Sequence, residues 1–485
     1  MKINFVSKTL ILLLVSSLFL NCSNKTDDIP ANLEVNDFVW KGLIAYYFWQ
    51  SAKPDLSDRK FSSQLQLNNY LSGFAAPEEL FENLLNRPTD RFSWIVDDYI
   101  ALENSFQGIN LSTGMEFGLV PYENNSGNYF GYVRYVVPNS DADIKGVTRG
   151  MLFNTVNGSL ITANNYRSLL FSQSGFTIGL ADYNNGNPTS NTSTFTLIKE
   201  EVVENPIHVS KIITEGTKKI GYLLYNQFAR NYDGELNAAI NNFKTAGIDH
   251  LVIDLRYNGG GSVATATYFG SMVTGQFNNQ LFSKEVWNEK VQAAVDEASF
   301  LNNFTDEILN KDRNGNIILQ ETINSLNFTE VYFIVSGSSA SASELLINSL
   351  RSYIDVKIVG TKTVGKQVGS VTLYDSDNLT KSGSNFNTNH TYAMQPIVFE
   401  ISNKDNKNEP NGFTPGVTLP GILLAEDYED LGILGDTNEP LLKRTIEYIT
   451  TGKKGISKTG IEVFKESFNS KLATPSSNNM YSSIK

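Results

Sequence analysis

The alternation of short apolar strands with helices between residues 205 and 450 constrains the fold of this chain most strongly. Residues 220–225 and 250–255 have the pattern of buried strands, and residues 235–246 between them have the pattern of a helix. The same rhythm returns after residue 330. Strand–helix–strand units of this kind join parallel strands whose faces are covered by the helices. We therefore predict an α/β core with a mostly parallel sheet over residues 204–450.

Three further regions flank this core, so the chain is predicted to be a multidomain α/β protein. Apolar residues recur at helical spacing over 33–104, which predicts a helical N-terminal domain. Short β-prone runs separated by Asn and Gly clusters predict a small β domain over 105–203. Residues 451–485 are rich in Ser, Asn and Lys without periodicity, and we expect this tail to be weakly ordered.

The N-terminus has the pattern of an export signal. A basic start is followed by the apolar run 10–20, which is too short to span a membrane as a mature helix. The run ends at Cys22, the only cysteine, and this position resembles the lipidated cysteine of bacterial lipoproteins, although Asn21 precedes it instead of a small residue. We expect a lipoprotein signal peptide over 1–22 and a tether over 23–32. The protein would then be exported and lipid-anchored on the periplasmic or cell-surface side. A plain secretory signal with an incidental cysteine is the alternative.

Charge and composition narrow the ligand classes. The net charge of −12 disfavours a nucleic-acid partner, which would require a basic surface. No phosphate-binding glycine loop is evident, and we expect no cofactor and no metal. Residues 310–321 come near the spacing of a calcium-binding loop, but Asn310 stands at the first ligand position and two basic residues reduce the local charge. An Asn-Gly turn at Asn314 and Gly315 is the simpler interpretation.

A strand, a tight turn and a helix over residues 331–353 give the strongest chemical signal. Small residues fill the turn, and Ser341 stands at the expected start of the helix. Helix N-termini present outward-pointing N–H groups that favour negative charge. A tetrahedral oxyanion formed on Ser341 would receive a hydrogen bond from the N–H of Ala342. Ser339 and Ser343 are neighbours of the same type, so position alone does not single out Ser341.

A serine nucleophile needs an adjacent base, and a lysine follows in the next motif. A strand ends at Gly360, and a glycine-flanked turn then presents Lys366. A lysine acts as a base only when it is neutral, a state that burial favours because burial depresses the pKa. The three histidines of the chain lie in no comparable motif.

A third motif, over residues 251–262, ends a buried strand with consecutive glycines. Gly260 and Gly261 can present backbone N–H groups without obstruction by side chains, which suits the second donor of an oxyanion hole. Asp254 and Arg256 precede them, and we expect these two side chains to pair and hold the loop.

Together the three motifs resemble the C-terminal (tail-specific) processing peptidases, serine proteases of the S41 type. The resemblance rests on Ser-Ala-Ser-Glu at 341–344, on Thr-Val-Gly-Lys at 363–366 and on Asp-Leu-Arg-x-Asn-x-Gly-Gly at 254–261, with Lys366 standing 25 residues after Ser341. It implies a Ser341–Lys366 dyad and an oxyanion hole from Ala342, Gly260 and Gly261. Many members have Gln four residues after the lysine, where this chain has Ser370.

Residues 137–158 resemble the middle of a PDZ domain, which binds extended chains by adding a strand to a sheet edge. The resemblance rests on Pro138, Ser140, Ala142, Gly146, Gly150 and the Val-Asn-Gly at 156–158. It implies a peptide-binding loop and strand formed by Gly114, Met115, Glu116, Phe117 and Gly118. An unrelated small β domain is the alternative.

These motifs predict a serine endopeptidase that hydrolyses peptide bonds in exported polypeptides bound as extended strands. A non-catalytic peptide-binding lipoprotein with the same fold is the rival prediction.

Overall fold

A six-stranded sheet forms the centre of the largest region. Its order is β10-β11-β12-β18-β19-β24, and every pairing is parallel except that of β10 with β11. The strands are β10 (Ile207–Glu215), β11 (Lys218–Tyr225), β12 (His250–Asp254), β18 (Glu330–Val335), β19 (Asp355–Gly360) and β24 (Gly421–Leu423). The computed structural model describes residues 29–453, 466–474 and 477–485 of the chain.

Helices cover both faces of this sheet, because alternate strand residues enter two separate apolar cores. Phe333 packs on one face with three helices, while its neighbour Ile334 packs on the other face with a fourth. The three are α8 (Asp233–Ala246), α9 (Val263–Thr274) and α11 (Ala342–Leu350), and the fourth is α12 (Pro440–Thr451). The βαβ elements predicted from the sequence are therefore confirmed in this sheet.

A second six-stranded sheet in the same region is built differently. Its order is β13-β26-β20-β23-β14-β15, and it is antiparallel except at β26. The strands are β13 (Gly261–Ser262), β26 (Met480–Tyr481), β20 (Val368–Ser370), β23 (Ile397–Ser402), β14 (Leu281–Trp287) and β15 (Leu301–Asn303). A mostly parallel sheet thus describes only one of the two core sheets.

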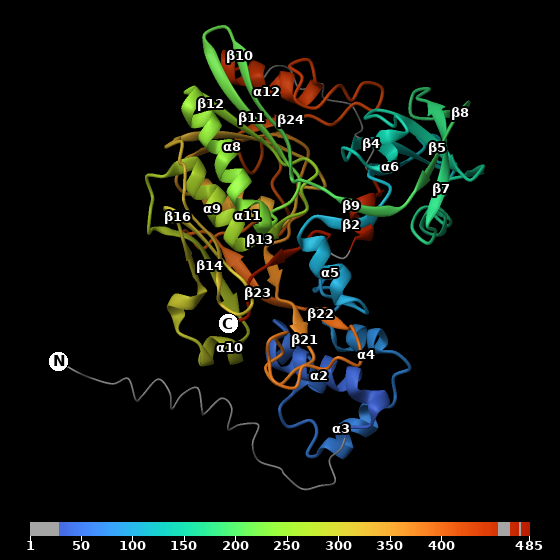
Figure 1. Ribbon diagram of the computed structural model, residues 1–485, viewed down its shortest axis with the longest axis vertical. Helices are drawn as coiled ribbons and strands as arrows, with labels where there is room; N and C mark the ends of the chain where they lie inside the picture. The colour runs from blue at the N-terminus through green and yellow to red at the C-terminus, as the bar shows by residue number, and fades with distance from the viewer. Residues whose placement is uncertain (1–28, 454–465, 475–476) are drawn as a thin grey trace, which may run out of the picture.

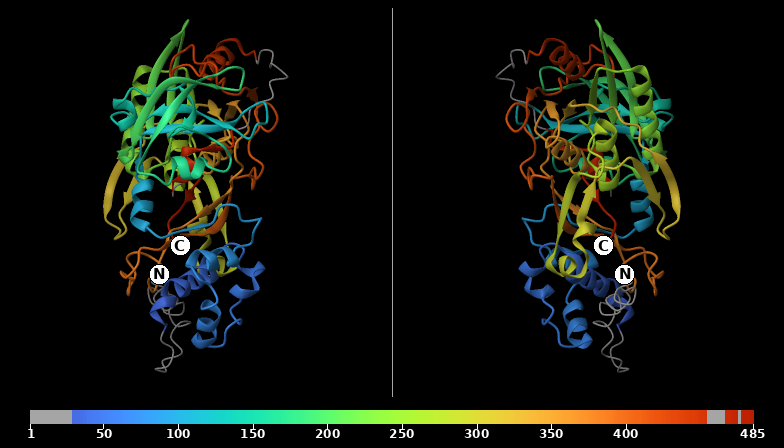
Figure 2. Two further views of the ribbon diagram at one scale, coloured as in Figure 1. Left: turned by 90° about the vertical axis from the view of Figure 1, so that its right-hand side faces the viewer. Right: turned by 90° about the vertical axis from the view of Figure 1, so that its left-hand side faces the viewer.

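The N-terminal helices lie at one end of the molecule (Figures 1 and 2). They are α2 (Glu34–Tyr46), α3 (Gln64–Leu71) and α4 (Pro77–Leu84), followed by β1 (Trp94–Val96) and α5 (Tyr99–Phe106). Strand β1 pairs with β22 (Ala393–Gln395), which is antiparallel to β21 (Leu373–Tyr374). The helical region is therefore joined to the core through a small three-stranded sheet.

The β-rich region over residues 105–203 lies beside the core, at the right of Figure 1. Its sheet has the order β25-β3-β4-β5-β7-β8. The strands are β25 (Phe468–Asn469), β3 (Met115–Pro121), β4 (Tyr129–Val136), β5 (Leu152–Val156), β7 (Gly175–Asp182) and β8 (Thr189–Ile198). Two short helices, α6 (Asp141–Ile144) and α7 (Tyr166–Leu170), belong to the same region. A separate pair, β2 (Ile109–Ser112) and β9 (Glu200–Val203), forms the connection to the core. Arg149 binds Glu426 at 2.8 Å and so ties this region to the core.

The prediction of a weakly ordered C-terminal tail is wrong for the described residues after 465. Strand β25 (Phe468–Asn469) adds to the edge of β3, a short 3-10 helix (Ser470–Ala473) follows, and β26 inserts between β13 and β20. Met480 is fully buried. These pairings are with strands far away in the sequence, so no local periodicity announces them.

The fold also tests the interpretation of residues 310–321. The segment that came near a calcium-loop spacing is a hairpin of β16 (Glu307–Lys311) and β17 (Ile317–Thr322), which confirms the simpler turn interpretation.

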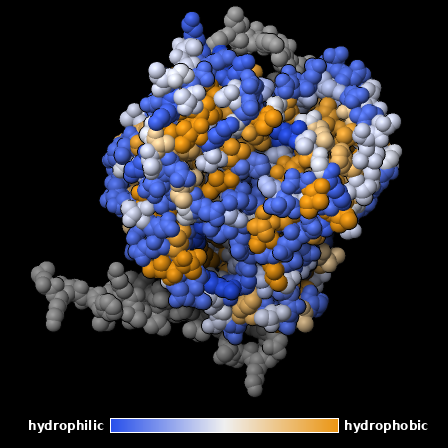
Figure 3. Space-filling model, turned by 45° about the horizontal axis from the view of Figure 1, so that its top comes forward, coloured by the Kyte–Doolittle hydropathy of each residue, from blue (hydrophilic) through white to orange (hydrophobic). Residues whose placement is uncertain are grey.

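Cys22 and the signal peptide lie outside the described residues. Within the described residues no helix has the length and apolarity to cross a bilayer. The face in Figure 3 carries separate hydrophobic patches among hydrophilic residues.

Candidate active site

Ser341 lies at the tight turn between β18 and α11. It is the residue before the first helical residue, and it has φ 62° and ψ −117°, a conformation that residues other than glycine rarely adopt. Such strain costs about 1–3 kcal/mol and persists where the surroundings enforce it, often at functional sites. Its side chain is fully buried, and its Oγ donates a hydrogen bond to the backbone carbonyl of Asn478 at 3.2 Å.

The neighbouring serines have different partners, which separates Ser341 from them. Ser339 Oγ donates to the carbonyl of Leu255 at 2.7 Å, and Ser343 Oγ donates to the carbonyl of Asn258 at 3.0 Å. Both hydroxyls therefore fasten the turn to the glycine loop after β12. Only Ser341 of the three directs its hydroxyl to the place where Lys366 also binds.

Lys366 is 2% exposed, and its Nζ donates to the same Asn478 carbonyl at 2.6 Å. The hydroxyl of Ser341 and the amine of Lys366 therefore converge on a single oxygen atom. Burial lowers the pKa of Lys366 to about 7, against an opposing influence of Asp90 and Glu344. A lysine in this environment is substantially neutral near neutral pH.

Glu344 connects the turn of Ser341 to the loop of Lys366. Its carboxylate accepts hydrogen bonds from the N–H of Ser341 at 3.0 Å, of Gly365 at 2.7 Å and of Lys366 at 2.8 Å, and from the hydroxyl of Thr363 at 2.5 Å. In the sequence Glu344 stands out only as the last residue of the Ser-Ala-Ser-Glu motif at 341–344. Its contacts with residues 363–366 depend on how two loops meet, so no helix pattern reveals them.

The N-terminal helical region also reaches Lys366. The ring of Phe92 lies 4.9 Å from Lys366 Nζ, and Arg91 donates to the carbonyl of Gly365 at 3.0 Å. Asp90 is fully buried, accepts the hydroxyl of Tyr47 at 2.9 Å and acts electrostatically on Lys366. The sequence offered no signal for these residues, because their role depends on the packing of one region against another.

The glycine loop after β12 lies directly against Ser341. A Cβ added to Gly260, which has φ 114°, would come within 2.5 Å of the Ser341 Cβ and 3.0 Å of the Ala342 nitrogen. Only glycine permits this approach. The N–H of Gly260 donates to Asn258 Oδ1 at 2.8 Å, and Gly261 is held in β13. Ala342 and Gly260 thus lie beside Ser341, whereas a Cβ on Gly261 would meet Phe228, and the N–H of Gly260 is already bound to Asn258. The role of the three residues as oxyanion donors stays a prediction.

Asp254 and Arg256 form the expected ion pair, which stabilises the start of this loop. Arg256 Nη2 binds Asp254 at 2.7 Å and Glu439 at 3.0 Å, and all three side chains are buried. Burial alone would lower the pKa of Arg256, but Asp254 and Glu439 raise it well above its usual range. The ion pair therefore supports the loop and does not contact Ser341.

The residues expected to bind peptide at 114–118 form the turn before β3 and its first half. Gly118 pairs with Asn469 of β25, and Glu116 accepts the hydroxyl of Ser470 at 2.6 Å. Ser370 stands at the family's Gln position, and its Oγ lies 2.5 Å from Gln395 Oε1 and 2.9 Å from Asn479 Oδ1. Its single hydroxyl proton can be donated to either of these oxygens.

A cavity of about 250 Å³ separates the β-rich region from the core and reaches Gly259 and Gly260. Directly at Ser341 and Lys366 the free space is only about 10 Å³, bordered by Met480. The C-terminal segment fills the cleft at this point.

Two family models match the chain. Residues 219–397 match peptidase family S41, a range that includes Ser341 and Lys366, and residues 34–94 match the peptidase S41 N-terminal domain.

Curated relatives match over parts of their length. A probable CtpA-like serine protease of Staphylococcus aureus is 26% identical over 267 residues, 55% of this chain and 46% of the relative. One from Staphylococcus epidermidis is 27% identical over 177 residues, 36% of this chain and 31% of the relative. The chain therefore spans less than half the length of these relatives.

The fold has a close counterpart among solved structures. A candidate S41 protease from Bacteroides fragilis has a TM-score of 0.63 at 23% identity, covering 86% of this chain and 97% of that one. This likeness concerns the fold alone. The chain therefore carries both domains of peptidase family S41, the N-terminal domain over residues 34–94 and the peptidase domain over residues 219–397.

Proposed function

We propose that this protein is a serine endopeptidase in which Ser341 is the nucleophile and Lys366 is the general base. The observation that carries the proposal is the convergence of Ser341 Oγ and Lys366 Nζ on the Asn478 carbonyl oxygen. Lys366 reaches a backbone carbonyl there, and burial brings its pKa to about 7. A buried lysine with this pKa is suited to accept the proton of a serine hydroxyl.

The reaction would begin once a substrate carbonyl replaces Asn478. Neutral Lys366 Nζ accepts the hydroxyl proton as Ser341 Oγ forms a bond to the carbonyl carbon. The backbone N–H of Ala342 and a donor from the glycine loop stabilise the resulting oxyanion. Protonated Lys366 then gives its proton to the leaving amine, and the C–N bond breaks. Water hydrolyses the acyl-enzyme with Lys366 again as base.

The dyad is tested by assaying unfolded, fluorescently labelled casein with the purified protein over several hours. Ser341→Ala and Lys366→Met should each reduce cleavage by at least about a thousand-fold, because nucleophile and base act as a unit. A fluorophosphonate probe should label Ser341, as mapped by mass spectrometry of the modified peptide.

Lys362→Met is the matched control, because Lys362 precedes the same turn but is exposed. It should cleave like the wild type. Equal cleavage by the wild type and Ser341→Ala would rule out the proposed nucleophile. Absence of both cleavage and labelling would favour a peptide-binding protein of this fold.

We also propose that the substrates are exported polypeptides bound as extended strands, partly by a PDZ-like β-rich region, and that Cys22 carries a lipid anchor. The antiparallel addition of β25 to β3 supports strand-wise binding. Growth with an alkyne fatty acid should label the wild type but not Cys22→Ala. Equal labelling of the two proteins would exclude the anchor.

A further inference from the structure

The last described residues of the chain are bound by the regions proposed to bind substrate. The first stretch, residues 466–474, adds to the edge of β3. Phe468 stands opposite Leu119 in this antiparallel pair, and the N–H of Ser467 donates to the carbonyl of Leu119 at 2.9 Å. The N–H of Phe117 donates to Ser470 Oγ at 2.9 Å. The tail thus extends a sheet edge by backbone pairing, as an extended peptide ligand does.

Side chains anchor this stretch against the apolar core of the β-rich region, beside α7. Phe468 is 7% exposed, and its ring lies 5.0 Å from that of Tyr166 and 5.2 Å from that of Phe171. Burial of a phenylalanine side chain contributes about 1.5–3 kcal/mol. Phe468 is therefore the main anchor of the stretch on the β-rich region.

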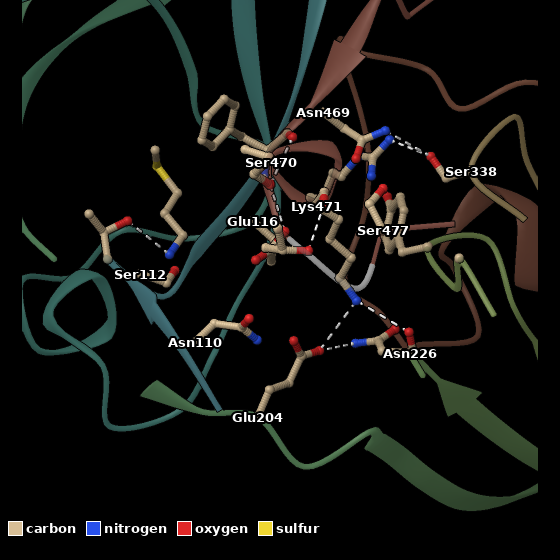
Figure 4. A pocket seen from close by; sticks show the side chains of 18 of the residues that line it. Asn110, Ser112, Glu116, Glu204, Asn226, Ser338, Asn469, Ser470, Lys471 and Ser477 are labelled. Atoms are coloured by element: carbon tan, nitrogen blue, oxygen red, sulfur yellow. Dashed lines mark hydrogen bonds and ion pairs between the residues drawn. The ribbon is translucent and has the colours of Figure 1, made fainter. Parts of the chain in front are cut away.

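Polar contacts fix the tail on the opposite side of the cavity, as Figure 4 shows. Lys471 Nζ donates to the Asn226 carbonyl at 3.2 Å and lies 3.7 Å from Glu204. Asn469 donates to Ser338 Oγ at 3.4 Å, in the turn that leads to Ser341. The tail therefore bridges the β-rich region and the core.

The second stretch, residues 477–485, lies across the dyad. Met480 and Tyr481 pair in parallel with Gly261 and Ser262 of β13. A Cβ on Gly259 would come within 3.1 Å of the Asn478 nitrogen, so the glycine loop makes room for the tail. This stretch occupies the space at Ser341 that a substrate strand would need.

The contacts at Asn478 are those of an inhibitor. In a productive complex the serine hydroxyl would donate to the lysine and its oxygen would face a carbonyl carbon. Here Ser341 Oγ and Lys366 Nζ both donate to one carbonyl oxygen, so the proton that the base must remove is engaged elsewhere. The carbonyl oxygen also faces the lysine and not a backbone N–H of the nucleophile turn.

We propose that residues 466–474 and 477–485 are a tethered inhibitor that occupies the peptide-binding edge and the dyad together, and that the enzyme is active only when an extended polypeptide displaces them. The inference rests on the proposed function. Because Phe468 packs against Tyr166 and Phe171, the apolar surface around these two rings should prefer an aromatic side chain in the displacing polypeptide.

Phe468→Ala in the full-length protein tests the inhibition. Loss of the anchor should raise kcat/KM on labelled casein about 10- to 100-fold, which corresponds to the loss of one buried aromatic side chain from a mostly closed state. Leu472→Ala is the matched control, since Leu472 lies in the same tail but is 39% exposed. A synthetic peptide of residues 466–485 should restore inhibition of the Phe468→Ala protein, while a scrambled peptide should not.

Hydrogen exchange in a Ser341→Ala background reports tail release without depending on activity. Exchange of the β3 and glycine-loop amides should rise in Phe468→Ala. Ser467→Pro, which removes the N–H that binds Leu119, is a second opening variant.

The two readouts together separate the failures. If exchange rises while casein cleavage stays at a measurable wild-type rate, the inhibition is overturned and the protease stands. If exchange rises and the opened protein neither cleaves casein nor labels with fluorophosphonate, the proposed activity fails and the inhibition with it. If neither variant raises exchange, the edge of β3 does not hold the tail and the proposal is wrong.

Discussion

Lys366 and Arg256 are two buried basic residues of the candidate site, and they have opposite electrostatic surroundings. Arg256 binds Asp254 and Glu439 through charge-assisted hydrogen bonds, and its pKa lies well above the usual range. Lys366 binds a neutral backbone carbonyl, and burial lowers its pKa to about 7. Burial is common to both residues, and the neighbouring carboxylates decide which one stays charged.

The contrast shows how one site can combine a rigid loop with a reactive amine on a second loop. A permanently charged arginine in a carboxylate cage fixes the geometry of residues 254–261 and gives up no proton. A lysine kept away from direct carboxylate contact can lose its proton near neutral pH. Glu344 illustrates the separation, because it binds the N–H of Lys366 and not its amine.

The largest expected effect is on catalysis at Lys366. Lys366→Met should reduce the rate of casein cleavage to about a thousandth of the wild-type rate or less, because no base remains for Ser341. It should also raise stability at neutral pH by about 1–3 kcal/mol, since a costly buried amine is removed. Urea unfolding measures the second effect. A less stable Lys366→Met protein would contradict the assigned cost of burial.

Arg256→Met should act on stability in the opposite direction. It removes the cation that lies between Asp254 and Glu439 and leaves Glu439 with the more distant Arg149 at 3.8 Å, and breaking such a network costs about 3–5 kcal/mol. The midpoint of urea unfolding should fall accordingly. The exposed Lys362→Met serves as the control, and an unchanged midpoint for Arg256→Met would mean that the two carboxylates find another partner or a proton.

Glu344→Gln should impair catalysis by positioning. One amide oxygen cannot accept all the hydrogen bonds that the carboxylate accepts, so we expect kcat to fall about 10- to 100-fold with little change in KM. Because Glu344 raises the pKa of Lys366, its neutralisation should also shift the pH profile to lower pH. A lower kcat with an unmoved profile would indicate a purely structural role.

The smallest effect is the pH dependence of the wild type. Below about pH 7 Lys366 is protonated and cannot accept a proton, so kcat/KM should fall about tenfold per pH unit. Between pH 7 and the ordinary lysine pKa of 10.5 the unfolded chain binds the proton and the folded protein does not, so this residue's contribution to stability rises with pH over that window. A flat rate profile from pH 5 to 8 would show that another group is the base.

Much of the candidate site could be predicted from local patterns. The strand β18, the small-residue turn and helix α11 place Ser341 at the turn, and the glycine-flanked turn after β19 presents Lys366. These are short-range properties of the chain, set by apolar periodicity and by the small residues that a sharp turn requires. Three connections to Lys366 could not be predicted, since they join segments distant in sequence. They come from Glu344, Asp90 and Phe92.

The C-terminal tail marks the limit of the sequence most clearly. Its polar composition predicted weak order, yet Phe468 and Met480 are buried. Two short strands have too few residues for a periodic signal, and their order comes from pairing with β3, β13 and β20.

Local patterns were enough to predict the parallel core sheet, the turn of Ser341 and the position of Lys366, because each depends on residues that are neighbours along the chain. The packing of the whole chain was needed to place the Lys366 amine against a backbone carbonyl, to enclose Arg256 between carboxylates and to lay the tail over Ser341. Burial, charge pairing and strand addition depend on which distant segments meet, and that is settled when the whole chain packs.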